Sequence, residues 1–133
     1  MKWEAIRALV IDDSAFSGNL VKSLLHSIGI RTIRLCQSGT EGLDIFRANP
    51  EKLDIVITDW LMPDMSGLDV LKAIRAKTSP RRDLPVVLIT GEPKSERVLE
   101  GRQHGAQDFL VKPISKARLE ASLLKVLSAP LRS

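Results

Sequence analysis

Short apolar runs recur along the chain, and each ends at polar or turn-forming residues. The runs are rich in β-branched side chains, which is typical of buried strands. Four of them lie at residues 8–11, 54–58, 85–89 and 109–111, and a weaker fifth run lies at 32–36. The pattern therefore predicts five strands.

Between the strands, apolar residues recur with the spacing of an amphipathic helix. Phe16, Leu20, Leu24 and Ile28 form the first such stripe, and Gly29 follows it as a C-terminal stop. We therefore expect a helix over this segment, with the stripe as its apolar face.

A second helix is predicted from its start and stop signals. Ser38 with Glu41 three residues later is a capping-box signature, because each side chain can bind the other residue's backbone N–H. Leu43 and Phe46 supply apolar positions, and the Asn-Pro pair at 49–50 ends the pattern.

Three further helices complete the pattern. The third begins at Ser66, and the fifth opens near Ser115. The fourth, at about 94–104, has only Val98 and Leu99 as apolar anchors and is the weakest of the five.

This alternation of strands and helices predicts an α/β fold with a mostly parallel sheet covered by helices on both faces. Right-handed crossovers leave few topologies, and we expect a doubly wound, five-stranded sheet of order 2-1-3-4-5. The 133 residues suffice for one domain, which we place at 5–128, with a C-terminal tail at 129–133.

Composition excludes several classes of protein. The single cysteine, Cys36, cannot form an intrachain disulfide, which favours a reducing, cytoplasmic setting. The apolar runs are too short to span a membrane, so no membrane association is expected. The net charge is +4, and one basic cluster at Arg75, Lys77, Arg81 and Arg82 reads as a solvated helix end and loop. Because no helix-turn-helix or basic-aromatic pattern accompanies it, we expect no direct nucleic-acid binding.

Polar residues with chemical potential stand where the predicted strands end. Asp12 and Asp13 follow the first strand, Asp59 the third, Thr90 the fourth and Lys112 the fifth. Any one of them alone is more often a helix cap or a solvated loop residue. Because the carboxyl ends of parallel strands share one rim of the sheet, where ligands bind in such folds, their joint placement predicts a site.

The charges of this site favour a metal ion. Three carboxylates in one cleft repel each other, and Lys112 offsets only one of them. Mg²⁺ prefers such hard oxygen ligands and needs few of them from the protein. A carboxylate beside Mg²⁺ and a lysine can act as a nucleophile and form an aspartyl-phosphate. Thr90 can donate a hydrogen bond to the transferred group.

Four ordered motifs resemble those of response-regulator receivers in two-component signalling. They cover the acidic turn at 9–14, the segment Asp-Trp-Leu-Met-Pro-Asp-Met-Ser-Gly at 59–67, the strand end at 88–91 and the segment at 105–113 that contains Lys112-Pro113. The resemblance runs from about residue 7 to 127. It implies a receiver that stands alone, as chemotaxis regulators do.

The resemblance also implies a role for each site residue. Asp59 would be the phosphoacceptor, Lys112 would contact the phosphoryl group, and the bond from Lys112 to Pro113 would be cis. Asp13 and Asp59 would bind the metal ion directly, Asp12 would act largely through water, and the Leu61 carbonyl would complete the site. Thr90 and Phe109 would be the switch pair.

Two positions depart from the usual family pattern. Gly91 stands where alanine is common, and Phe109 where tyrosine is common. Glycine and alanine are both small, so either residue at position 91 leaves room for a phosphoryl group. A switching mechanism that needs a phenol hydroxyl cannot operate here, and Phe109 can also be read as an ordinary core residue.

Partners follow from the same resemblance. The phosphodonor would be a histidine kinase or a histidine phosphotransfer protein. The output would be binding of an effector, or self-dimerisation, through the face made by the fourth helix, the fifth strand and the fifth helix. Such a receiver is a signalling protein that catalyses only its own phosphorylation and its own slow dephosphorylation.

Three other functions fit the sequence less well. A haloacid-dehalogenase-type phosphatase would have two Asp separated by one residue early in the chain, and a cap domain. A flavodoxin-like nucleotide binder would have a Gly/Ser/Thr-rich loop where Asp12-Asp13-Ser14 stands. A degenerate receiver used only for protein binding would not need the complete set of acidic, Thr and Lys residues.

Overall fold

Strands and helices alternate along the chain in the computed structural model, which describes residues 1–91 and 95–128. The predicted tail at 129–133 and the predicted start of the fourth helix near Lys94 lie outside these residues. The elements are η1 (Trp3–Ala5), β1 (Arg7–Ile11), α1 (Ala15–Ile28), β2 (Thr32–Cys36), α2 (Gly39–Ala48), η2 (Pro50–Lys52), β3 (Ile55–Asp59), α3 (Gly67–Arg75), β4 (Val86–Thr90), α4 (Ser95–Gln103), β5 (Asp108–Val111) and α5 (Lys116–Leu127).

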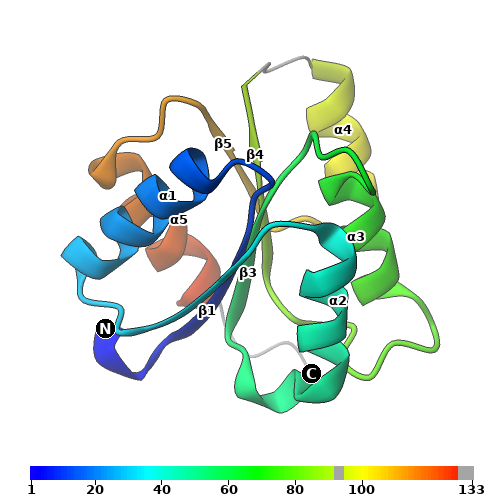
Figure 1. Cartoon of the computed structure of the whole chain (residues 1–133), viewed down its shortest axis with the longest axis horizontal. Coiled ribbons are helices and arrows are strands. Elements are labelled where there is room, and N and C mark those ends of the chain that lie inside the picture. The colour runs from blue at the N-terminus through cyan, green and yellow to red at the C-terminus, as the bar shows by residue number, and fades with distance from the viewer. Residues whose placement is uncertain (92–94, 129–133) are drawn as a thin grey trace.

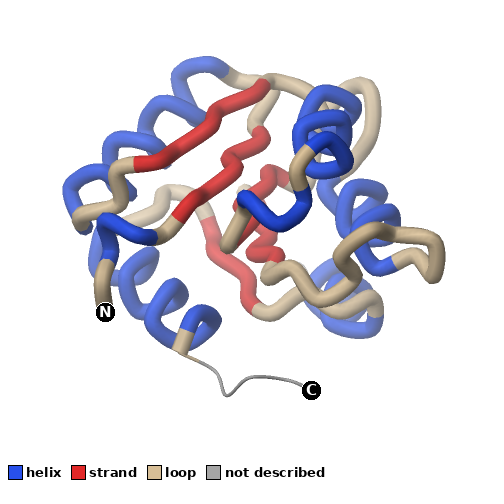
Figure 2. The backbone as a smooth tube through the Cα atoms, turned by 90° about the horizontal axis from the view of Figure 1, so that it is seen from below, coloured by secondary structure: helices blue, strands red, loops and turns tan. Residues whose placement is uncertain are grey.

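The five strands form one parallel sheet in the order β2-β1-β3-β4-β5, as predicted. All four strand pairs are parallel, so every strand ends at the same rim. Helices α1 and α5 cover one face, and α2, α3 and α4 cover the other (Figure 1). The view from below shows the strands enclosed between these helices (Figure 2).

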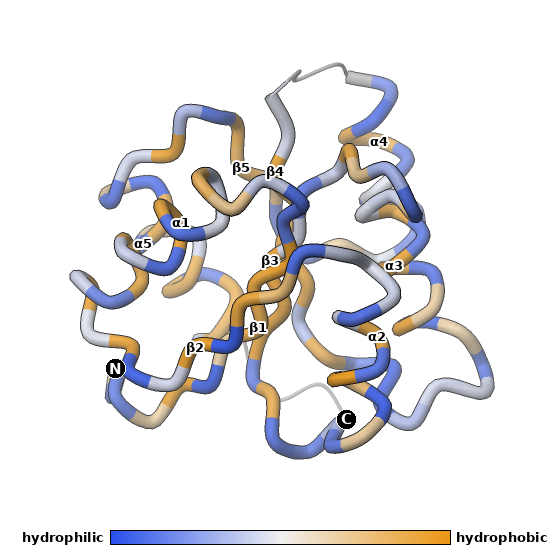
Figure 3. The backbone as a smooth tube through the Cα atoms, viewed as in Figure 1, coloured by the Kyte–Doolittle hydropathy of each residue, from blue (hydrophilic) through white to orange (hydrophobic). Residues whose placement is uncertain are grey.

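The core consists of two apolar clusters, one on each face of the sheet. Alternate residues of β1 enter different clusters: Leu9 and Ile11 face α2 and α3, whereas Ala8 and Val10 face α1 and α5. This period of two is the geometry of a strand buried on both sides. The sheet is accordingly the most apolar part of the chain (Figure 3).

Serine N-caps begin four of the helices. The Ser38 hydroxyl accepts the Glu41 N–H, and Ser115 caps α5 in the same way. Ser66 and Asp69 form a reciprocal capping box at the start of α3. At the other end of α1, Gly29 has a φ of 124°, which favours glycine, so the predicted stop is confirmed.

The predicted apolar stripe of α1 is wrong in its first half, although the helix itself is confirmed. Phe16 is 82% exposed and Leu20 is 46% exposed, whereas Leu24 is partly buried and Ile28 is buried; the remaining buried residues of the helix are Gly18, Val21 and Leu25. Gly18 explains which side of α1 packs against the sheet. A Cβ at this position would lie 2.8 Å from Leu35 Cδ1, so the helix can approach β2 this closely only on its glycine face.

The predicted anchoring of α4 is also partly wrong. Val98 is half-buried, but Leu99 is 58% exposed. Among residues 96–103 of the helix, whose burial the structure describes, only Gly101 is buried, and it contributes no side chain to the core. Helix α4 is therefore held by little apolar burial, and such elements open most easily.

Arg75 links three segments at the edge of the sheet where the strands begin, opposite the rim where they end. Its guanidinium donates to the carbonyls of Arg82, Leu84 and Gly105 and to the Gln107 side chain. Gln107 Oε1 also accepts the Val86 N–H. The end of α3 is thereby tied to the starts of β4 and β5.

The neighbouring arginines bind backbone in the same manner. Arg81 donates to the carbonyls of Pro50 and Leu53, and Arg82 donates to the carbonyl of Arg75. Three members of the basic cluster therefore bind backbone carbonyls of neighbouring segments, whereas the sequence predicted only a solvated helix end and loop.

We predict that Arg75→Met lowers the free energy of unfolding by about 3 kcal/mol, because several carbonyls lose a charged donor at once. Urea denaturation measures the change. Lys77→Met is the control, since it removes the same charge from an exposed side chain nearby and should cost about 0.5 kcal/mol or less. Equal losses in the two variants would contradict the cross-linking role.

Candidate functional site

The rim at the carboxyl ends of the strands carries the predicted site residues. Asp59 and Thr90 are the last residues of β3 and β4, and Asp12 follows β1 directly. Lys112 follows β5, and its N–H donates to the Thr90 carbonyl. The fold thus brings together residues spread over a hundred positions of sequence.

Three carboxylates meet at this rim. Asp12, Asp13 and Asp59 each place one oxygen within 4.8 Å of the others, and Asp13 is the exposed member. Asp12 is 1% exposed and Asp59 is 8% exposed. Such a set of hard oxygen ligands fits a small divalent cation that keeps part of its water shell.

Lys112 lies between two of these carboxylates. Its Nζ is 3.3 Å from Asp59 Oδ2 and 3.6 Å from Asp12 Oδ2. The peptide bond from Lys112 to Pro113 is cis, as the resemblance implied. Among the described residues, one ammonium lies beside three carboxylates, an excess of negative charge that favours a further cation.

Backbone amides bind the other oxygens of the two buried carboxylates. Asp59 Oδ1 accepts the Trp60 N–H at 3.0 Å, and Asp12 Oδ1 accepts the Ser14 N–H at 3.0 Å. Asp12 Oδ2 is buried without a hydrogen-bond partner. A buried acceptor left in this way costs free energy, which a bound cation or its water would recover.

Burial raises the pKa of Asp59 above its ordinary value. Lys112 opposes this shift by favouring the charged form, whereas the nearby charge of Asp12 adds to it. Ionisation of Asp59 therefore lowers the free energy of unfolding. A cation bound beside the carboxylate, or loss of its charge, would remove this destabilisation.

The loop after β3 approaches the site closely. A Cβ on Gly67 would lie 2.4 Å from the Asp59 carbonyl oxygen, so glycine is required there. The Gly67 N–H donates to the Trp60 carbonyl at 2.8 Å and closes the loop. Leu61, the predicted carbonyl ligand, lies in this loop with its side chain 55% exposed.

Thr90 and Phe109 both lie on the face of the sheet that α4 covers. Phe109 pairs with Leu88 and packs against the same apolar cluster. Its ring occupies the space that a side chain on Gly101 would need, since a Cβ there would lie 2.6 Å from Phe109 Cζ. The guanidinium of Arg102 stands over the ring at 5.7 Å.

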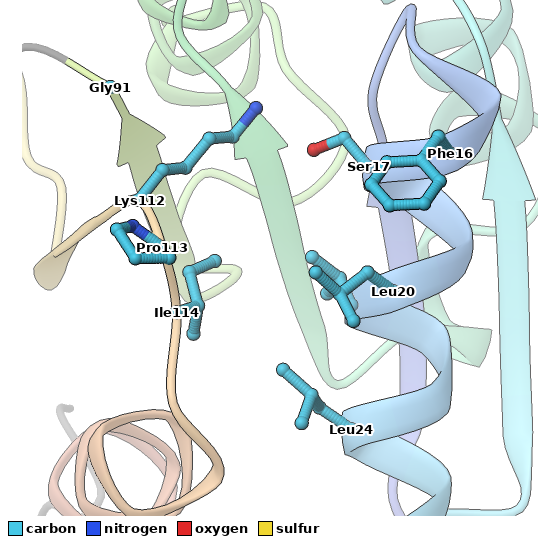
Figure 4. A pocket seen from close by; sticks show the side chains of 9 residues that line it. Phe16, Ser17, Leu20, Leu24, Gly91, Lys112, Pro113 and Ile114 are labelled. Atoms are coloured by element: carbon cyan, nitrogen blue, oxygen red, sulfur yellow. The ribbon is translucent and has the colours of Figure 1, made fainter.

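An apolar groove opens beside Lys112, and the sequence did not predict it. Its volume is about 360 Å³, and its walls come from α1 and from the segment after β5. Figure 4 shows Phe16, Leu20 and Leu24 on one side, facing Pro113 and Ile114 on the other. The exposed stripe of α1 was the signal, because a helix with two apolar stripes can bury only one of them in the core.

Fold and site together define a class of protein. A parallel α/β sheet whose strand ends carry a buried carboxylate, two further carboxylates and a lysine is built to accept a phosphoryl group beside a divalent cation. Among the described residues, none of the helices combines the length and apolarity needed to span a bilayer.

Comparison with known proteins agrees with this class. The sequence profile of the response regulator receiver domain matches residues 8–124. Chemotaxis protein CheY-3 of Vibrio cholerae is 36% identical over 121 residues, which cover 91% of each chain. A response regulator receiver domain protein from Clostridium thermocellum has a TM-score of 0.84 at 32% identity, over 92% of this chain and 94% of that one.

A chain of the CheX–CheY–BeF3–Mg²⁺ complex from Borrelia burgdorferi has a TM-score of 0.82 at 26% identity, over 95% of this chain and 98% of its own. The present chain belongs to the response regulator receiver family. It is a phosphoacceptor of the chemotaxis-regulator kind, and its acidic cluster is where such receivers bind Mg²⁺.

We predict that Asp59→Asn stabilises the protein when divalent cations are removed by EDTA. The pKa of Asp59 is raised in the folded state, so its ionisation disfavours folding once the pH exceeds the unfolded value near 4. The variant should therefore melt a few degrees (~3 °C) higher at pH 7, and the difference should vanish as the pH falls toward 4.

Mg²⁺ supplies the control in the same melting experiment. At ten times its Kd it should stabilise the wild type by about 1.4 kcal/mol, and it should stabilise Asp59→Asn much less. A variant that is less stable than wild type in EDTA at pH 7 would contradict the electrostatic account.

Proposed function

We propose that Asp59 accepts a phosphoryl group from a phosphohistidine protein, and that Lys112 and Thr90 assist the transfer. The observation that carries this assignment is the position of the Asp59 carboxylate. It is buried at a strand end, 3.3 Å from the Lys112 ammonium and beside two other carboxylates.

The residues of the chain divide the work of transfer. Asp59 Oδ2 attacks phosphorus while the bond to the donor nitrogen breaks and the electron pair leaves with the imidazole. Lys112 Nζ neutralises charge on the phosphoryl oxygens, and the Thr90 hydroxyl donates a hydrogen bond to one of them. Gly91 adds no side chain, and a Cβ there would meet no atom within 4 Å, so room remains for the group.

Mg²⁺, when bound, supplies further positive charge to the same oxygens. Asp13 and Asp59 would hold it directly, Asp12 largely through water, and the Leu61 carbonyl would complete the protein ligands. The buried Asp12 Oδ2, which accepts no hydrogen bond although Lys112 Nζ lies 3.6 Å away, supports this set, since a metal-bound water is a suitable donor for it. Slow dephosphorylation would follow when water reaches the same phosphorus.

The groove beside Lys112 supports a protein donor, which we propose is a histidine kinase or a histidine phosphotransfer protein. A donor histidine must come within bonding distance of Asp59, so the donor surface has to cover the rim next to Lys112. Phe16 and Leu20 offer exposed apolar area there, at 82% and 46% exposure. Such patches mark protein-binding surfaces.

Two phosphodonors, acetyl phosphate and a phosphohistidine protein, test the acceptor. With Mg²⁺, intact-mass measurement should show one added phosphoryl group from either donor, and the label should decay slowly once the donor is removed. Asp59→Asn should lose labelling from both. Asp44→Asn, an exposed carboxylate on α2, should label like wild type. Undiminished labelling of Asp59→Asn would exclude Asp59 as the acceptor.

The same experiment separates docking from chemistry. Leu20→Asn should slow labelling by the protein donor about tenfold, because it places a polar group in an apolar contact. Labelling by acetyl phosphate should stay unchanged. Leu124→Asn, which changes an apolar residue of similar exposure on α5 outside the groove, is the control. An equal effect on both donors would contradict docking at the groove.

We further propose that the output face consists of α4, β5 and α5. Thr90 sits at the end of β4, and Phe109 rests against Gly101 on the same side of the sheet. A phosphoryl group adds about −1.5 to −2 charges at the rim and would draw the Thr90 hydroxyl toward it. Movement of Thr90 would enlarge the space beside Phe109 and allow its ring to turn inward. The weakly anchored α4 would then shift, which would alter binding to an effector or a second copy.

Amide hydrogen exchange tests this route without a known effector. Phosphorylation should change exchange rates in α4 and β5 of the wild type at least ~3-fold. Thr90→Ala, labelled to the same extent, should show less than half of that change. An undiminished response in the variant would exclude the route through Thr90 and Phe109 and leave Asp59 as acceptor untouched.

A further inference from the structure

An interaction outside the acidic cluster joins the loop after β3 to the start of α2. Asp64 Oδ2 accepts the Thr40 N–H at 3.2 Å and the Thr40 hydroxyl at 3.0 Å. Both residues are exposed, and they are 24 positions apart in sequence. Thr40 lies outside the four family motifs, and Asp64 lies within the segment 59–67 but was given no role at the site.

The contact completes the cap of α2 from another segment. The first N–H groups of a helix have no partner within the helix. Ser38 binds the Glu41 N–H, and Asp64 binds the Thr40 N–H. A carboxylate at this end also meets the positive pole of the helix. Slight desolvation opposes it, but the Thr40 amide and hydroxyl lower the pKa of Asp64, so the contact is charged at neutral pH.

The loop that Asp64 fixes is the loop that carries Leu61. Its first residue is held because the Trp60 N–H donates to the Ile89 carbonyl at 2.8 Å. Its last part is held by Met65, which fills the space beside Gly39, where a Cβ would lie 2.3 Å from Met65 Cγ. Asp64 ties the stretch between these two anchors to α2.

We propose that Asp64 and Thr40 form a latch that positions the Leu61 carbonyl for the divalent cation before the cation arrives. The latch rests on the proposed metal site and names positioning residues for it. Neither residue contacts the cation. Their effect is to remove conformational freedom from a ligand, and such outer partners typically change metal affinity about tenfold or more.

Calorimetric titration with MgCl2 tests the latch in the full chain. Asp64→Ala should raise the Kd for Mg²⁺ about tenfold. Thr40→Val keeps the N–H but lacks the hydroxyl and should raise it about threefold, since it leaves one of two bonds. Thr40→Ser retains both donors and should restore the wild-type Kd within about twofold. Combining Asp64→Ala with Thr40→Val should add little, because both remove one interaction.

Ser38→Ala separates the latch from simple loss of a helix cap. It removes the other side-chain cap of α2 and should lower the metal-free stability by about 1 kcal/mol, a loss similar to the one expected for Asp64→Ala. Of these two variants, only Asp64→Ala should weaken the binding of Mg²⁺. If both variants change the Kd equally, or if neither does while the wild type binds Mg²⁺, the latch is wrong and the metal site stands. If the wild type itself does not bind Mg²⁺, the metal site and the latch are both overturned.

Discussion

Repulsion among three carboxylates at one rim of the sheet is the constraint around which the rest of the molecule is arranged. Asp12 and Asp59 are buried, and Lys112 is the ammonium that lies within 4 Å of both. The burial that raises the pKa of Asp59 also keeps its carboxylate close to Lys112 and to the space a cation would fill. A site of this kind is unfavourable when empty and becomes favourable on binding a cation or gaining a phosphoryl group, so its occupancy can be communicated to the fold.

The parallel sheet supplies two separate sides on which such a change can be used. On one side, α1 and the segment after β5 form the apolar groove that opens at Lys112. On the other, Phe109 packs against a glycine of α4, a helix with little apolar burial. Entry of a phosphoryl group and its readout can therefore involve different surfaces, connected through the strand ends that both sides share.

Within the layer formed by α2, α3 and α4, the tethering contacts lie around α2 and α3. The capping box at Ser66, the close approach of Gly67 to Asp59 and the contact between Asp64 and Thr40 all fix the loop that follows the acceptor. Arg75 fixes the opposite end of the same helix layer through backbone carbonyls. The contrast with α4 follows from these contacts, since a helix held by few buried side chains has a smaller cost of local opening.

The sequence by itself determined the strands, the helix starts at Ser38, Ser66 and Ser115, the sheet order and the residues that meet at the rim. These follow from local periodicity and from the rule that parallel strands end on one side. The structure was needed to show which side of α1 faces solvent. The side with Phe16 and the side with Gly18 both fit a helical spacing of apolar residues, and only the close approach of Gly18 to Leu35 shows which side is buried. Likewise, the partners of Arg75 and Asp64 lie many positions away in sequence, so no local pattern encodes them. Their hydrogen bonds exist because the fold brings backbone groups without partners of their own beside a charged side chain.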